Sequence, residues 1–201
     1  MDNENAGKTG HGHGHGHGDG QSHGMRMYLR FGAMILTAMV VMYGVMFVSS
    51  WQWSHIRFSE SRVYMALTMG GTMGLIMLGY MLDMFRNTKA NLGVVVASLL
   101  LLGGGVFLDR SQTTVQDSGW MNSMIPHHSM AITRSERAEI SDVRVCELAK
   151  QISKAQRKEI LEMMWLIEDI ERNGVAATAQ DAQARPVPSF EEAADRQCTA
   201  G

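Results

Sequence analysis

Three long apolar segments, residues 31–51, 63–82 and 92–108, restrict the possible folds of this chain most strongly. Each is close to the roughly 17–25 residues that a helix needs to cross the hydrocarbon core of a bilayer. The linkers between them are short, and the remaining sequence is too small to cover three buried apolar helices in water. We therefore predict an all-α chain with a three-helix membrane region, residues 28–110, whose partner is the lipid bilayer.

Basic residues near the ends of these segments indicate an orientation. Cytoplasmic loops of membrane proteins carry an excess of Lys and Arg. Four basic residues fall on one side of the predicted membrane and three on the other; the two sets are Arg26, Arg30, Arg86 and Lys89, and Arg57, Arg62 and Arg110. This margin favours an inner-membrane protein of a bacterium, with its N-terminus inside and its C-terminal domain on the periplasmic or extracytoplasmic side.

The second apolar segment has a methionine at every fourth position, among 18 methionines in the chain. Such a ridge can be a flexible packing surface, or a row of thioethers that offers weak successive sites to Cu(I). Gly70 and Gly74 have the spacing that lets a neighbouring membrane helix approach closely. The ridge consists of Met65, Met69, Met73, Met77 and Met81, and Met84 follows it.

The N-terminal residues 1–27 are rich in Gly and His, and we predict that they are disordered because nothing apolar is present to bury. Imidazoles in such a tract can bind Ni, Cu or Zn without prior order. The alternatives are an engineered tag or a low-complexity tail without a role. The candidate auxiliary metal ligands are His11, His13, His15, His17 and His23.

Residues 111–174 alternate charged and apolar residues and predict two helices that form an antiparallel hairpin. Thr114 begins a capping-box pattern, so the first helix is expected to start there and to run to about residue 138, with a kink near Pro126. The second helix is expected from residues 141–142 to about residue 172, where Asn173 and Gly174 end it. Residues 175–201, which contain two prolines, are predicted to be disordered.

Each predicted helix has one apolar face, and polar groups interrupt both. On the first helix, Met121, Met124 and His128 share a face, with His127 at its edge. Glu159 and Gln156 fall within the stripe of the second helix, and a buried carboxylate needs a partner. An imidazole facing Glu159 would provide that partner. The predicted stripe is Leu148, Ile152, Ala155, Met163, Ile167 and Ile170.

Thioethers and neutral imidazoles together suit soft ions, so the cluster is a candidate site for Cu(I), with Ag(I) as the second choice. A histidine on an apolar face can equally be structural. Cys146 and Cys198 form no CxxC motif, and we expect two ordinary unpaired thiols, although a disulfide is possible in an oxidising compartment.

The segment Trp120–Ile132, with the sequence WMNSMIPHHSMAI, followed by Glu147–Leu148–Ala149, Gln156 and residues 159–163, resembles the family called domain of unknown function 305. The resemblance covers about residues 114–174. That family has ferritin-like helical units, and some members are exported copper- or silver-binding proteins. The resemblance implies a metal site formed by Met121, Met124, His127, His128 and Met163, with Met130 as a further ligand and Gln156 and Glu159 behind them.

These observations favour a non-enzymatic, membrane-anchored protein that sequesters or hands over copper at the cell envelope. Two helices bury a core poorly by themselves, so we expect a homodimer whose hairpins form a four-helix bundle. One alternative is a structural or sensory dimerisation module without a metal role. Another is a di-metal oxidase, but its Glu-x-x-His pairs are absent from the sequence. The near-neutral charge gives no reason to expect a nucleic acid, and no organic cofactor motif is present.

Overall fold

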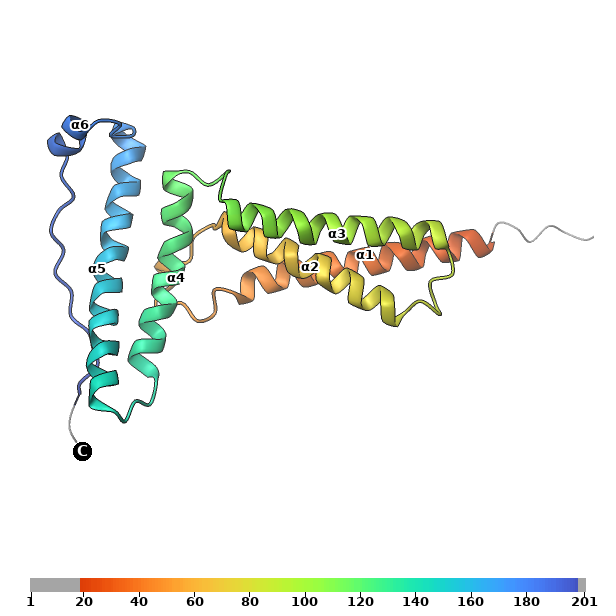
Figure 1. Cartoon of the computed structure of the whole chain (residues 1–201), viewed down its shortest axis with the longest axis horizontal. Coiled ribbons are helices and arrows are strands. Elements are labelled where there is room, and N and C mark those ends of the chain that lie inside the picture. The colour runs from red at the N-terminus through yellow and green to blue at the C-terminus, as the bar shows by residue number, and fades with distance from the viewer. Residues whose placement is uncertain (1–18, 199–201) are drawn as a thin grey trace, which may run out of the picture.

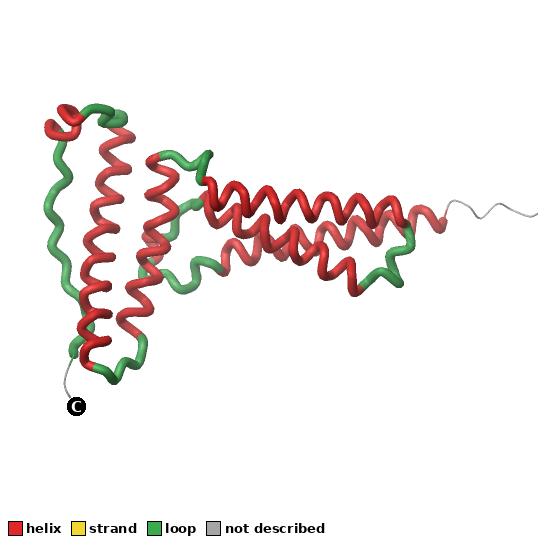
Figure 2. The backbone as a smooth tube through the Cα atoms, viewed as in Figure 1, coloured by secondary structure: helices red, strands yellow, loops and turns green. Residues whose placement is uncertain are grey.

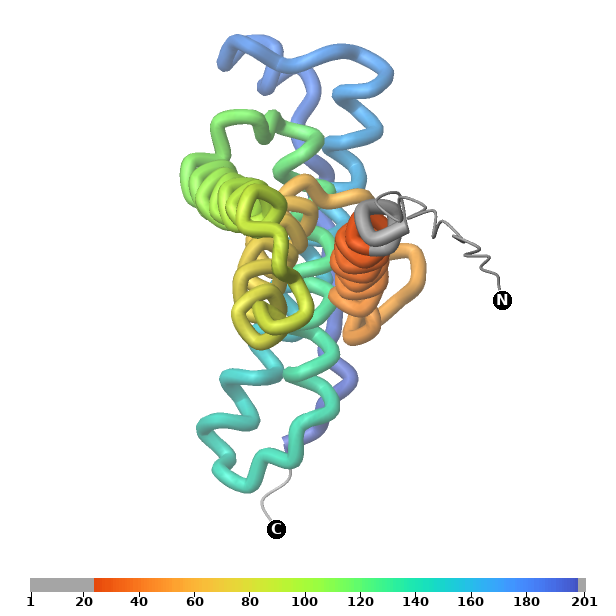
Figure 3. Tube along the Cα trace, turned by 90° about the vertical axis from the view of Figure 1, so that its right-hand side faces the viewer, coloured from red at the N-terminus to blue at the C-terminus, as the bar shows by residue number. Residues whose placement is uncertain are grey.

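The structure, a computed structural model, describes residues 19–198, with side chains from Gly24 onward, and every regular element in that range is helical. Three long helices form one bundle, and two further helices lie across its end (Figures 1 and 2). The predicted architecture, an all-α chain with three apolar helices followed by an antiparallel hairpin, is confirmed. In Figure 3 the three-helix bundle is seen end-on, with the hairpin crossing behind it.

The three helices of the bundle are α1 (Asp19–Val45), α2 (Glu60–Tyr80) and α3 (Thr88–Ser111). All three are long and apolar enough to cross a membrane, which indicates a membrane-associated protein. Helix α1 begins well before residue 28, so its first turns include part of the segment that was predicted to be disordered. Asn87 caps α3 by accepting hydrogen bonds from the backbone N–H groups of Lys89 and Ala90.

Glycines and a serine permit close packing of these helices. Gly70 faces the side chain of Met39 on α1, whereas Gly74 faces the Ser98 side chain on α3. The prediction that both glycines admit a neighbouring helix is confirmed, and the two serve different neighbours. A Cβ atom on Gly71 would lie 2.5 Å from the backbone oxygen of Ser98, so α2 and α3 touch backbone to backbone there.

The methionine ridge of α2 divides into two parts. Met73, Met77 and Met81 pack against an apolar cluster between α1 and α2 that contains Phe31, Ile35, Leu78 and Phe85. Met65 and Met69 are 47% and 44% exposed and face outward. The packing interpretation therefore accounts for the three ridge methionines that are farther from the hairpin.

The hairpin consists of α4 (Asp117–Arg137) and α5 (Val143–Asn173). The predicted N-cap at Thr114 is wrong: α4 begins after Gln116, and the Thr114 hydroxyl hydrogen bonds to Tyr64 on α2 instead. Helix α4 continues through Pro126 as one element. Helix α5 begins and ends where predicted, with Asp142 as N-cap and Gly174 at a φ of +76° as C-cap.

The stripe predicted for α5 is correct only in its C-terminal half. Met163 and Ile167 are buried against α4 and Ile170 packs against the same core, but Leu148, Ile152 and Ala155 are exposed. Ile160, which the prediction omitted, is also buried there. The buried face in the N-terminal half is instead Cys146, Ala149 and Ser153. These positions continue the alternating three- and four-residue spacing of the C-terminal half, and their small side chains let the helices approach.

The segment after α5 is not disordered over residues 175–198, contrary to the prediction. It contains a short helix, α6 (Ala179–Ala184), and then runs back along α5 (Figure 1). Ion pairs join Arg185 to Asp169 at 2.6 Å and Asp195 to Arg157 at 2.6 Å. A disulfide joins Cys146 to Cys198, so the expectation of two unpaired thiols is also wrong. These links hold a segment that contains few apolar residues to drive folding.

Candidate metal centre

The linker between α1 and α2 holds helix α4 against the bundle of α1, α2 and α3, called the membrane bundle below. The backbone N–H of Trp51 donates to Ser129 Oγ at 2.7 Å, and the same oxygen lies 2.9 Å from His55 Nδ1. His55 is in a short 3-10 helix, Trp53–His55, and is only 8% exposed. Burial, assisted by Arg57 and Arg157, lowers the pKa of His55 and favours its neutral form.

Three of the predicted methionine ligands lie in the core between α4 and α5. Met121 and Met163 are buried members of that core, beside Ile125 and Ile160, and half-buried Met124 packs against it. The buried thioethers of Met121 and Met163 are shielded from water, whereas that of Met124 is partly accessible. This placement is compatible both with simple packing and with soft-metal ligation.

His128 and Glu159 face each other across the seam between the helices, as predicted. His128 Nδ1 lies 3.1 Å from Glu159 Oε2, and Gln156 donates to the same oxygen at 3.2 Å. The carboxylate is out of line with the ring N–H, so the buried Nδ1 atom is close to an acceptor without forming a hydrogen bond. A small rotation of either side chain would complete the bond that metal-bound imidazoles usually make.

Burial controls the charge of His128. Its side chain is 13% exposed, and desolvation lowers its pKa below the ordinary value of 6.5. The Glu159 carboxylate opposes that shift, and the neighbouring His127 adds slightly to it. A neutral imidazole is the form that binds metals, so the surroundings of His128 favour the ligating state at neutral pH.

The antiparallel arrangement brings two methionines near this pair. Met124 lies four residues before His128 on α4, and Met163 lies four residues after Glu159 on α5. Because the two helices run in opposite directions, both steps lead one turn toward the same end of the hairpin. Met124 and Met163 are therefore the thioethers nearest in register to the His128–Glu159 pair.

Two predicted ligands are not brought into the core. His127 is exposed, and its ring centre lies 6.1 Å from that of His128. Met130 faces the membrane bundle, where the Arg62 guanidinium donates to its sulfur at 3.9 Å. Because a fixed positive charge beside a thioether repels a metal cation, Met130 is a poor ligand in this fold.

The histidines at positions 11, 13, 15 and 17 lie outside the described residues, as does the side chain of His23. Within the part of the chain that the structure describes, no three His, Cys, Asp or Glu side chains gather to hold a metal ion. Any site in one copy of the hairpin would therefore depend on methionine sulfur.

Two buried polar groups at or beside the hairpin were missed by the sequence analysis. One is His55, which lies in a linker without periodicity. The other is Glu136, whose side chain is 4% exposed and accepts a hydrogen bond from Ser153. Arg157 lies 3.5 Å from this carboxylate, and the backbone N–H of Asp195 donates to it at 3.0 Å. The one available signal was the serine at position 153, on a face where apolar residues would be expected.

Comparison with known proteins places this hairpin in a family. The model of the family described as Domain of unknown function (DUF305) matches residues 117–198. Uncharacterized protein L153 of Acanthamoeba polyphaga mimivirus is 33% identical over 116 residues, which are 57% of this chain and 74% of that protein. The chain belongs to the DUF305 family. No solved structure matches it.

The DUF305 match extends beyond the hairpin to Cys198. It therefore includes the C-terminal segment that the disulfide and the Asp195–Arg157 ion pair attach to α5. The resemblance noted from the sequence ended at about residue 174, so the DUF305 unit is longer than predicted. The function of the family is unknown, and the matched names assign no ligand or activity.

Proposed function

We propose that this DUF305 protein is a membrane-anchored binding protein for a soft metal ion, Cu(I) or Ag(I), that sequesters the ion or hands it over at the cell envelope. The observation that carries the proposal is the His128–Glu159 pair with Met124 and Met163 one turn away. A thioether and imidazole donor set suits Cu(I) and Ag(I) better than harder ions. The proposal is for binding, not for catalysis.

The donors of the hairpin fit such an ion chemically. Thioethers carry no proton, and the lowered pKa of His128 removes the proton that would compete with a metal. Glu159, close to Nδ1, would orient the ring and leave its other nitrogen as the ligand. The half-buried position of Met124 gives an ion a route from solvent that the buried Met121 does not offer.

A homodimer would complete both the hairpin and the site. Leu148 and Ile152 are 54% and 39% exposed on the side of α5 that also carries Glu159. On α4, exposed His127 lies near the middle of the helix. A two-fold axis through that point would bring both copies' His127 and His128 together in a four-helix bundle. Exposed Leu148 and Ile152 would then be covered by the second copy.

The proposed location of the hairpin is outside the cytoplasm. The Cys146–Cys198 disulfide supports this location, since disulfides persist in oxidising compartments. The excess of basic residues at the opposite end of the membrane bundle agrees. Blocking thiols in intact cells should leave both cysteines unlabelled until a reductant is added. Labelling without reductant would contradict this location.

The test is a Cu(I) titration of the full chain in detergent, under reducing conditions, against a competing chelator. The five N-terminal histidines are first replaced by alanine, so that only the rest of the chain can bind. Replacing His127 and His128 by alanine should then weaken binding by more than about 100-fold, beyond the roughly 10–100-fold cost of removing a residue behind the ligands. The matched control is Arg134→Ala, an exposed change on the same helix. Equal affinity in the two variants would refute the proposal.

A structural dimerisation module is the second candidate, because Met121 and Met163 are already accounted for as core residues. It predicts that the His127/His128 variant loses stability or dimerisation while Cu(I) affinity is unchanged. The same titration, combined with a mass measurement in detergent, separates the two functions.

A further inference from the structure

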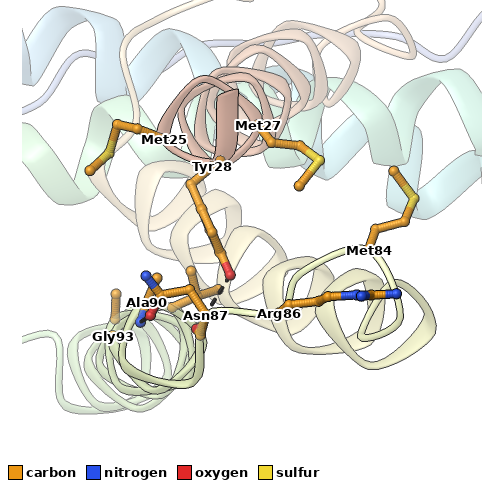
Figure 4. A pocket seen from close by; sticks show the side chains of 11 residues that line it. Met25, Met27, Tyr28, Met84, Arg86, Asn87, Ala90 and Gly93 are labelled. Atoms are coloured by element: carbon orange, nitrogen blue, oxygen red, sulfur yellow. Dashed lines mark hydrogen bonds between the residues drawn. The ribbon is translucent and has the colours of Figure 1, made fainter. Parts of the chain in front are cut away.

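An open crevice lies at the end of the membrane bundle that is remote from the hairpin. It has a volume of about 1040 Å³ and is bounded by the start of α1, the α2–α3 linker and the start of α3. Figure 4 shows Met25 and Met27 on two sides of α1, with Arg86 and Asn87 across the gap. The volume is slightly above the roughly 300–1,000 Å³ that is typical of small-molecule sites.

Small residues on α3 leave space between α1 and α3 here, and one tyrosine spans it. Gly93 and Ala97 line the wall formed by α3, and a Cβ atom on Gly93 would meet no atom within 4 Å. Tyr28 extends from α1 across the gap, where its hydroxyl donates to Asn91 Oδ1 at 2.7 Å (Figure 4 shows its position). The crevice therefore lies where α3 carries small residues, beside the hydrogen bond by which Tyr28 joins α1 to α3.

The lining is apolar apart from three groups at one level. Methionines, Val94 and alanines form most of it, while Tyr28, Arg86 and Asn87 provide the polar groups, and none of the described lining residues is acidic. Residues 24–30 and 83–91 contain four basic residues and a single acid, Asp83. None of the ion pairs in the described part of the chain involves Arg86. An apolar crevice lined in part by a guanidinium outside those ion pairs is complementary to a molecule with a hydrocarbon chain and an anionic head.

We propose that this crevice binds one anionic phospholipid, with its phosphate against Arg86 and Asn87 and an acyl chain along Gly93 and Ala97. The position fits, since the ends of these helices lie at the level of the lipid headgroups. Basic pockets between membrane helices are known to recognise anionic headgroups. The proposal is independent of metal binding at the hairpin.

The experiment uses the full chain in detergent, titrated separately with phosphatidylglycerol and phosphatidylcholine, with bound lipid counted by native mass spectrometry. We expect one phosphatidylglycerol to be retained in preference to phosphatidylcholine. Arg86→Gln should weaken that binding about tenfold, the loss of one charge-assisted hydrogen bond, and Gly93→Leu should block it by placing a side chain where the acyl chain is proposed to lie. The matched controls are Arg110→Gln and Gly103→Leu. Arg110 and Gly103 lie on α3 outside the crevice lining, and a Cβ atom on Gly103 also meets no atom within 4 Å.

Equal retention of the two lipids would overturn the proposal. So would loss with Arg86→Gln but not with Gly93→Leu, because the headgroup would then bind an exposed arginine without use of the crevice. Displacement of the lipid by excess glycerol 3-phosphate would also overturn it, since a soluble phosphate ester would be sufficient. Thermal unfolding of each variant identifies any that fails to fold, and the two substitutions test the site independently.

Discussion

His128 Nδ1 on α4 lies 3.1 Å from Glu159 Oε2 on α5, buried but out of line for a hydrogen bond. This pair lies near the middle of the hairpin, where the two helices face each other at the candidate metal centre. Metal-bound imidazoles usually donate their second N–H to a carboxylate or carbonyl oxygen. The pair thus consists of a candidate imidazole ligand and the carboxylate that would support it. In this structure the two groups are not aligned for a hydrogen bond.

Glu159→Gln should weaken Cu(I) binding by about 10–100-fold, because an amide orients the ring less well and does not increase its basicity. The measurement is the chelator competition described above, on the chain without N-terminal histidines. Glu162→Gln is the matched control, since Glu162 pairs with Lys158 at 3.5 Å on the same helix. If the two variants bind Cu(I) equally, Glu159 does not support His128 as a metal ligand.

The protein should lose stability as the pH falls below about 6.5, the pKa of an unperturbed histidine. Burial lowers the pKa values of both His55 and His128, so the unfolded chain takes up protons in this range before the folded chain does. Stability from these groups is therefore present above pH 6.5 and declines through the window between the unfolded and folded values. Thermal unfolding at pH 7.5, 6.5 and 5.5 measures it. Replacing both histidines by Asn should flatten the profile over that range, and an unchanged slope would contradict this assignment.

Ile152→Glu should convert the proposed homodimer to a monomer, because it places a charge beside Leu148 on the surface that the second copy would cover. The control is Gln151→Glu, which adds the same charge at the adjacent exposed position. Mass measurement in detergent by light scattering gives the result. If the unmodified chain is a monomer, the proposed homodimer is wrong.

Gly71→Ala should destabilise the membrane bundle by about 1–3 kcal/mol, the usual cost of overpacking. Its new methyl group would lie 2.5 Å from Ser98 O and 2.6 Å from Leu102 N, and a backbone cannot give way as a side chain can. Gly79→Ala on the same helix meets no atom within 4 Å and should be neutral or better. Thermal unfolding in one detergent compares the two, and equal midpoints would show that α2 and α3 are less closely packed.

Much of the fold could be predicted because it follows from local pattern. Apolar length identified the three long helices, and Asp142 and Gly174 marked the ends of α5. The start of α4 could not be predicted, because the Thr114 hydroxyl is used by Tyr64, fifty residues earlier in the chain. That contact exists only after the bundle and the hairpin have met.

The face of α5 was misjudged for a similar reason. Leu148 and Ile152 are more apolar than Ala149 and Ser153, yet the small residues are buried. On that face Ser153 donates to Glu136 of α4, and Arg157 lies 3.5 Å from the same carboxylate, contacts that the sequence of α5 alone does not show. The disulfide could not be derived either, since its two cysteines are 52 residues apart and nothing local marks the pairing.

Of the candidate site, the structure places Met121, Met124 and Met163 at the core of the hairpin and His128 opposite Glu159. Met130 lies beside Arg62 of α2, a neighbour that spacing along one helix could not indicate. Spacing along a helix shows which side chains share a face, but not what another element places against that face.

The most direct test of the central claim is X-ray absorption at the copper edge of the Cu(I)-loaded full chain without its N-terminal histidines. The account predicts a mixed shell of thioether sulfur and imidazole nitrogen, with the nitrogen lost in the His127→Ala/His128→Ala variant and sulfur reduced by Met124→Leu. A shell that is unchanged by both variants, or one without sulfur, would contradict a metal centre in the hairpin.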